Sequence, residues 1–351
     1  MKFRKSSFLY LGSVVSFIVY ILVIDKNYFN GSYGEIKLSP MMIYTQELYT
    51  SISYAYLIQR SINLRLNKSA FNFRDFIKGL NPVFFTVFII FNFLILISGD
   101  RDPLITSVMI FLACFIFSVK IKLKLKVILP LLIISIFSIM YLGIVRQIDT
   151  SVSFKESVEF VKERNLESTY VSIGTIELAG SFRTTNLVVD YIPKYHDHFY
   201  GRFFLKNTFS IIPGLSQVLI NIFFKNDPDY LNTSANYITY LNQGSNPKYG
   251  DGTSSPADIY LDFGVIGIVI IFLIFGAVVR RFEITLFKDT NNISLFFLIV
   301  SICYFAGAIR LGRISLIEPF NLAVRVAIFT YLNRIFITKK SNTQEEELTI
   351  V

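Results

Sequence analysis

Long apolar runs separated by short charged segments set the main constraint on this chain. Eight runs are each long enough to cross a hydrocarbon core about 30 Å thick as a helix. The run at 38–58 is the weakest, because Gln46 and Glu47 interrupt it. We therefore predict an all-α polytopic membrane protein with spans at residues 7–24, 38–58, 80–98, 103–119, 127–145, 259–279, 291–309 and 314–337.

Lysine and arginine are distributed unevenly over the segments between these runs. The chain is 53% apolar and only 17% charged, which excludes an ordinary soluble domain. Its net charge of +9 gathers in alternate segments, at residues 2–5, 60–78, 120–126, 280–288 and 339–340. By the positive-inside rule these segments and both termini are cytoplasmic. The basic balance therefore indicates topology, and no nucleic-acid partner is expected.

One segment between the runs is far longer than the rest, and the predicted topology places it outside. Within it, residues 153–170 have the pattern of an amphipathic surface helix. Residues 169–191 and 203–224 form either outer structure or a re-entrant pair, which gives eight to ten transmembrane helices in all. The predicted domains are a transmembrane bundle at 1–145, a large extracytoplasmic segment at 146–258, a second bundle at 259–337 and a cytoplasmic tail at 338–351.

The stretch YGDGTSSPADIYLDFG at residues 249–264 carries a glycine-rich loop into a long apolar helix. Ser255 is expected to cap this helix, with Pro256 at its first position. Asp258 then fits two roles, an acid of the capping box or a base that deprotonates a sugar hydroxyl. A helix N-terminus favours an anion, but Asp258 in its first turn would repel a diphosphate. The stretch is therefore predicted to face an acceptor sugar.

Several other titratable residues are weaker candidates for acid–base chemistry or metal binding. Asp251 lies in a GDG turn, and Asp262 is expected to pair with an arginine. His196 and His198 flank Asp197 without metal-ligand spacing, so a surface turn is favoured over zinc, and either histidine fits a base. Two short Asp-x-Asp patterns, at 100–102 and 227–229, resemble metal-binding pairs, but a metal-free site is favoured because Arg101 interrupts the first.

Arginines recur on the predicted outer face, against the topology bias. Each one alone fits snorkelling toward headgroups or pairing with a nearby acid. As a set they fit a ligand with phosphate oxygens, which guanidinium groups bind bidentately. We predict that a lipid diphosphate is bound by Arg101, Arg146, Arg183, Arg202, Arg310 and Arg313.

Two further groups of residues are open to a structural or a functional interpretation. Glu47, Glu318 and Arg325 are charges within the predicted spans, and Arg325 is interpreted as part of an internal ion pair that locks the bundle. Tyr249 and Tyr260 suit stacking on sugar rings, although tyrosines also populate membrane interfaces.

Residue patterns over the last two thirds of the chain resemble those of the Wzy-type O-antigen and capsular polysaccharide polymerases, also called oligosaccharide repeat-unit polymerases. The resemblance rests on ADIYLDFGVIG at 257–267, on SFRTTNLVVDYIPKY at 181–195, and on Arg101, Arg146, Tyr200-Gly201 and Ile212-Pro213. The chain departs from the family where Gly214 replaces a basic residue and where Asp258 replaces the commoner glutamate.

The resemblance implies a glycosyltransferase of the bacterial inner membrane, with a GT-C-like architecture and no cofactor. It would move a growing glycan from polyprenyl diphosphate to the nonreducing end of a lipid-linked repeat unit. The arginines would bind the diphosphate leaving group, and Asp258, Asp251 or His196 would act as base. A chain-length regulator and a flippase are the implied partners. Two alternatives stay open, an O-antigen ligase that uses a histidine and a flippase of lipid-linked sugars.

Overall fold

The regular secondary structure of the described residues is all helical, without a strand. The computed structural model describes residues 7–26, 28, 39–67, 72–98, 100–119, 173–211, 218, 222–225, 227–247, 250–286, 292–308 and 314–349. The predicted all-α class is confirmed for these residues. The helices are α1 (Ser7–Val23), α2 (Pro40–Leu66), α3 (Phe73–Gly79), α4 (Pro82–Ser98), α5 (Arg101–Val119), α8 (Ile173–Tyr191), α9 (Arg202–Phe209), α11 (Ser234–Gln243), α12 (Ser255–Leu286), α13 (Asn292–Ala308) and α14 (Glu318–Thr349).

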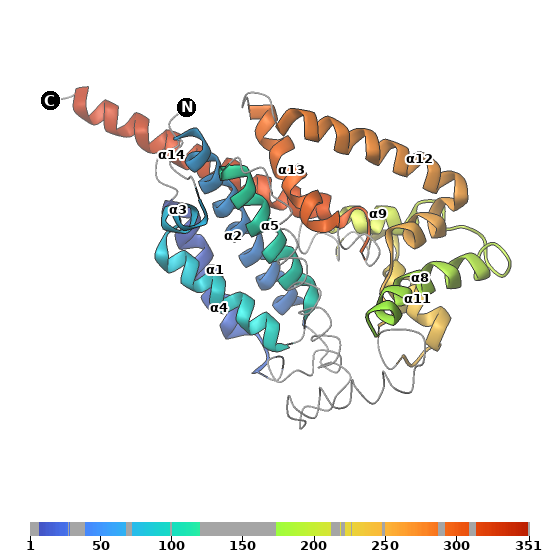
Figure 1. Cartoon of the computed structure of the whole chain (residues 1–351). Helices are drawn as coiled ribbons and strands as arrows, with labels where there is room; N and C mark the ends of the chain where they lie inside the picture. The colour runs from blue at the N-terminus through green and yellow to red at the C-terminus, as the bar shows by residue number, and fades with distance from the viewer. Residues whose placement is uncertain are drawn as a thin grey trace.

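A bundle of helices from both ends of the chain surrounds α2 (Figure 1). Helices α1, α5 and α14 pack directly on α2, and α13 packs on α5 and α14. Their shared core includes Leu57 of α2, Phe84 of α4, Cys114 of α5, Ile299 of α13 and Val326 of α14. The N-terminal and C-terminal spans thus form one body.

Helix α2 is the most polar of the expected spans, and it occupies the centre of this bundle. Glu47 of α2 lies 3.0 Å from the Arg325 guanidinium of α14, which confirms the predicted internal ion pair. Gln59 accepts a 2.7 Å hydrogen bond from the Asn333 amide, also of α14. Because hydrocarbon offers no partner to a polar side chain, such residues face neighbouring helices. Helix α2 extends to Leu66, eight residues beyond the expected end at residue 58.

The described helices match the expected spans in position more closely than in length. The stretch Ser255–Val278 is the one described helix that is long and apolar enough to cross a bilayer alone, and α3 with α4 forms a second, bent by 107°. Shorter apolar helices at Phe8–Val23, Asp102–Ser118 and Leu295–Tyr304 coincide with three expected spans. The expected span at 127–145 lies outside the described residues. The total of eight to ten spans therefore stays a prediction.

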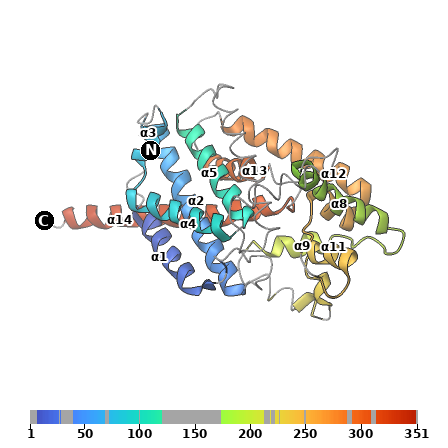
Figure 2. The ribbon, with the colours of Figure 1, turned by 60° about the horizontal axis from the view of Figure 1, so that its bottom comes forward.

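The described part of the predicted outer segment packs around a small core of its own. Val188 of α8, Phe203 of α9, Tyr237 of α11 and Leu261 of α12 meet there. Figure 2 shows these four helices grouped at the end of the molecule away from α1 and α4. The amphipathic helix expected at 153–170 and the boundary at residue 146 lie outside the described residues. The start of α12 thus belongs to the outer core, and the rest of α12 leaves it.

Candidate functional site

Helix α12 is broken at Gly264, where the backbone adopts φ 65° and ψ −161°. A turn before α9 docks against this break. His198 Nδ1 lies 2.9 Å from the carbonyl oxygen of Tyr260, and the Phe199 amide donates to the carbonyl of Leu261, also at 2.9 Å. The turn thus supplies donors to carbonyl groups beside the break, as interrupted helices at a membrane require.

Asp262 completes this contact by capping α9. Its carboxylate accepts hydrogen bonds from the backbone amides of Phe203 at 3.2 Å and Phe204 at 2.6 Å. These amides belong to the first turn of α9 and have no partner within that helix. Among the described residues no arginine pairs with Asp262, so the expected pairing is not found there, and the carboxylate is used as a helix cap instead.

Gly264→Ala is expected to destabilise the protein by about 1–3 kcal/mol, because an L-residue is strained at this φ. The added Cβ would also lie 3.0 Å from the His198 ring. Thermal unfolding of the detergent-solubilised protein measures the change. Gly276→Ala is the matched control in the same helix, since its Cβ would meet nothing within 4 Å. Equal melting temperatures for the two variants would contradict the strained break.

The helix start itself differs by one residue from the expectation. Ser254 caps α12, because its Oγ accepts a 3.2 Å hydrogen bond from the Ala257 amide. Ser255 is already helical and instead donates from Oγ to the carbonyl oxygen of Ile314, at 2.7 Å. The predicted cap at Ser255 is therefore wrong. The contact ties the start of α12 to the segment that precedes α14, and Arg313 directly precedes Ile314 in the sequence.

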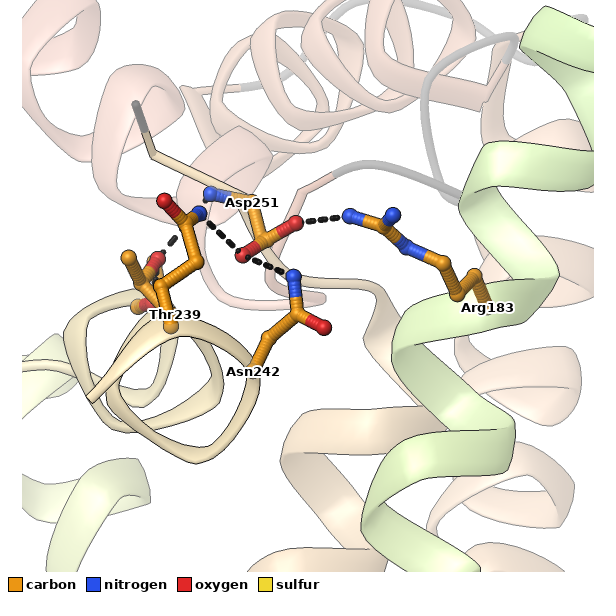
Figure 3. A network of polar contacts seen from close by, with 6 residues as sticks. Arg183, Thr239, Asn242 and Asp251 are labelled. Atoms are coloured by element: carbon orange, nitrogen blue, oxygen red, sulfur yellow. Dashed lines mark hydrogen bonds and ion pairs between the residues drawn. The ribbon is translucent and has the colours of Figure 1, made fainter. Parts of the chain in front are cut away.

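Asp251 is the centre of a polar network that joins α8, α11 and the loop before α12 (Figure 3). One carboxylate oxygen pairs with the Arg183 guanidinium. The other accepts from Asn242 Nδ2 at 2.9 Å and Gln243 Nε2 at 2.7 Å. The Asp251 amide donates to Thr239 Oγ1 at 3.0 Å. Because both oxygens are engaged, Asp251 is suited to holding Arg183 in place.

Arg183 is the exposed member of that network. Its side chain is 54% exposed, whereas that of Asp251 is 1% exposed. One guanidinium nitrogen faces Asp251, and a guanidinium has five N–H donors in all. Arg183 therefore combines a fixed orientation with free donors, which is the arrangement that suits a phosphate or diphosphate.

Asp258 lies seven residues after Asp251 in the sequence, and its side chain is enclosed. It is 6% exposed, and its Oδ1 accepts from the hydroxyl of Thr253. Hydroxyls of Ser234 and Ser315 lie near the same carboxyl group. Its Oδ2 has no hydrogen-bond partner among the described residues. Asp258 is thus a buried acid that is held among hydroxyl groups, with Oδ2 enclosed.

The other predicted catalytic and sugar-binding residues make contacts of their own, or lie outside the described residues. His196 is exposed, and its ring stacks on Phe199 at 4.5 Å between centroids. Tyr260 is buried in the outer core, where its hydroxyl donates to the carbonyl of Ile192 at 3.1 Å. Tyr249 lies outside the described residues. The structure therefore brings neither His196 nor Tyr260 into the Asp251 network.

The remaining predicted arginines are only partly described. Arg202 pairs with Asp227, which also lies 2.9 Å from Lys206 Nζ. Although partial burial opposes it, hydrogen bonds from Arg202 and Lys206 lower the pKa of Asp227 below its usual value. Arg101 begins α5, but its side chain is outside the description, as are Arg146, Arg310 and Arg313 altogether. Arg183 is therefore the one predicted phosphate ligand whose described side chain is more than half exposed, since that of Arg202 is 24% exposed.

Both Asp-x-Asp patterns have structural roles in the described residues. Asp227 is held by the two cations of α9. Asp100 accepts a 3.0 Å hydrogen bond from the Tyr28 hydroxyl, and its Oδ1 lies 3.3 Å from the Asp102 amide in the first turn of α5. Asp227 and Asp100 are thus each engaged in contacts within the described protein.

Sequence reasoning missed the neutral side chains that build this region. Asn242 and Gln243 end α11 and hold Asp251, and Thr253, Ser234 and Ser315 surround Asp258. All five are common types in loops and at helix ends, so their identity alone carries no signal. Only the packing of α11 and of the segment before α14 against α12 makes them neighbours.

The family model described as O-antigen polysaccharide polymerase Wzy matches residues 2–345, nearly the whole chain. No curated protein and no solved structure matches it.

Proposed function

The chain belongs to the O-antigen polysaccharide polymerase Wzy family, and from this premise we propose that it elongates a surface polysaccharide on a lipid carrier. It transfers a growing glycan from polyprenyl diphosphate to the nonreducing end of a lipid-linked repeat unit. The observation that carries the proposal is the exposed Arg183 held by the buried Asp251. The family is one of membrane proteins of polysaccharide biosynthesis, and its substrate is a lipid-linked repeat unit.

Arg183 binds the diphosphate leaving group in this proposal. As the bond between sugar C1 and the phosphate oxygen breaks, negative charge develops on the diphosphate, and fixed cationic donors stabilise it. Asp251 acts as a positioning residue, because it fixes the guanidinium through its contacts with α11. The other outer arginines complete the binding site, namely Arg101, Arg146, Arg202, Arg310 and Arg313.

Asp258 is the proposed general base. It takes the proton of the acceptor hydroxyl while the acceptor oxygen forms its bond to C1 and the diphosphate leaves with the electrons of the broken bond. Support comes from Oδ2, which has no hydrogen-bond partner among the described residues, and from the proximity of Asp251 in sequence, because one residue, Gly252, separates it from Thr253, which holds Oδ1. His196 is the alternative base, since it is exposed on the same outer segment.

The wider architecture proposed for the protein rests on the apolar runs of the sequence and on its distribution of positive charge. Eight to ten spans, both termini in the cytoplasm and a GT-C-like arrangement place the site on the outer face of the bacterial inner membrane. Because the sugar is already activated by its diphosphate, the reaction uses no cofactor. A flippase delivers the repeat units, and a chain-length regulator limits elongation.

Expression in a strain that makes the cognate repeat unit but lacks its polymerase tests the proposal. The gene is expected to convert surface glycan of one repeat unit into a ladder of long chains, measured by gel electrophoresis. Two control strains lack either their O-antigen ligase or their flippase. The gene should not restore surface glycan in either of them. Rescue of either control strain, or a glycan that stays one unit long in the first strain, would contradict a polymerase.

A further inference from the structure

Helix α9 has two sides of opposite environment. Phe203 and Lys206 share one side and are 1% and 3% exposed. Phe204 and Leu205 lie on the other side and are 39% and 50% exposed. Residues three apart share a helix face, whereas adjacent residues diverge, so this exposure follows from the way α9 docks. The outward side of α9 is therefore apolar and exposed.

This outward side is continuous with the exposed face of α12. The rings of Phe204 and Phe263 lie 6.0 Å apart, and Phe263 directly precedes the break at Gly264. Beyond the break, Val265 and Ile266 are 64% and 74% exposed on the one described helix that can cross a bilayer alone. An exposed apolar surface thus extends from α12 onto α9.

The far end of α9 widens the same surface. Phe209 stacks on Phe223 with 6.3 Å between ring centroids. Ile222 and Phe223 are both about two-thirds exposed. At the near end, Tyr200 is exposed and has φ 51°, a conformation uncommon for a bulky residue. Contiguous apolar surface of this kind marks a contact with a membrane or another molecule.

Charges directly beneath α9 limit how deep this surface lies. Arg202 and Lys206 bind Asp227 on the inward side, and Lys206 also donates to the carbonyl of Leu231 at 2.6 Å. Charged groups are costly at the centre of a bilayer and are tolerated at its interface, where tyrosine is also enriched. A shallow position lets the apolar side of α9 contact acyl chains while the charged groups on its other side stay near the headgroups.

We propose that α9, with Tyr200, Ile222 and Phe223, lies in the bilayer interface and inserts Phe204 and Leu205 into the boundary between headgroups and acyl chains. The occupant of this surface is membrane lipid, because the surface continues the exposed face of α12, the described helix that is long and apolar enough to cross a bilayer alone. Interfacial helices of this kind bury their apolar side by about 5–10 Å. The docking holds the Gly264 break and its Asp262 cap at the level of the headgroups, whatever reaction the site performs.

The chain contains no tryptophan, so a single introduced indole reports without background. Phe204→Trp and Leu205→Trp variants of the full chain are reconstituted in phosphatidylcholine vesicles that carry bromine either near the ester end or near the methyl end of the acyl chains. Bromine quenches an indole only at close contact. We expect both variants to lose about half or more of their emission with the bromine near the ester end, and less with the deep bromine.

Ser245→Trp is the matched control, because Ser245 is also exposed but lies in a polar loop. Its emission should be unaffected by brominated lipid and should be quenched by aqueous iodide. Two results would overturn the proposal. Absence of lipid quenching in both α9 variants would place the helix in water, and stronger quenching by the deep bromine would make it re-entrant.

Discussion

Arg183→Ala is expected to lower the rate of chain elongation by about 100-fold, because the developing charge on the diphosphate loses a fixed donor. The fold should survive this change. Asp251 is buried, but without Arg183 it keeps its hydrogen bonds from Asn242 and Gln243. The measurement is glycan length against time with purified protein and lipid-linked repeat units.

Three variants separate this role from a general effect of charge. Arg183→Lys keeps the charge but loses the planar fork, so an intermediate rate is expected. Asp251→Asn keeps the size of the side chain but weakens the orientation of Arg183, and it should raise the donor concentration needed for half-maximal rate. Arg74→Ala removes an exposed arginine of α3 and should leave elongation unchanged. Unchanged elongation in Arg183→Ala would remove Arg183 from the diphosphate site.

Local features of the chain were predictable because neighbours in sequence determine them. The helix start near residue 255 was placed within one residue, since capping depends on the side chains immediately before the helix. The ion pair of Arg325 within the bundle was predictable because an isolated charge is unfavourable in hydrocarbon. Glu318 precedes Arg325 by seven residues, which is two turns along one helix face. The partner is instead Glu47 of α2, which spacing along one helix could not indicate.

Features of the site that depend on long-range packing were not predictable. Arg183 and Asp251 are 68 residues apart, and each fits several pairings in sequence. The burial of Asp258 depends on hydroxyls from α11, the preceding loop and the segment before α14, which no local pattern connects. The cap formed by Asp262 required knowing that α9 docks on the break in α12.

Asp258→Asn is expected to lower elongation by about 10²–10⁴-fold, the usual effect of removing a general base. The amide is nearly isosteric with the carboxyl group, and it removes a charge from a site that is 6% exposed. Burial disfavours a charged side chain, so the thermal stability of the variant should equal or exceed that of the parent. Elongation and thermal unfolding are measured on the same preparation.

Asp262→Asn provides the matched control, because it makes the same chemical change one turn further along α12. There the carboxylate accepts from two backbone amides, and the amide side chain retains a single acceptor oxygen. This variant should lose about 1 kcal/mol of stability and retain its elongation rate. The two aspartates are thus expected to show opposite profiles, one catalytic and one structural. Full elongation by Asp258→Asn would leave Asp258 a structural residue of the helix start and transfer the role of base to His196.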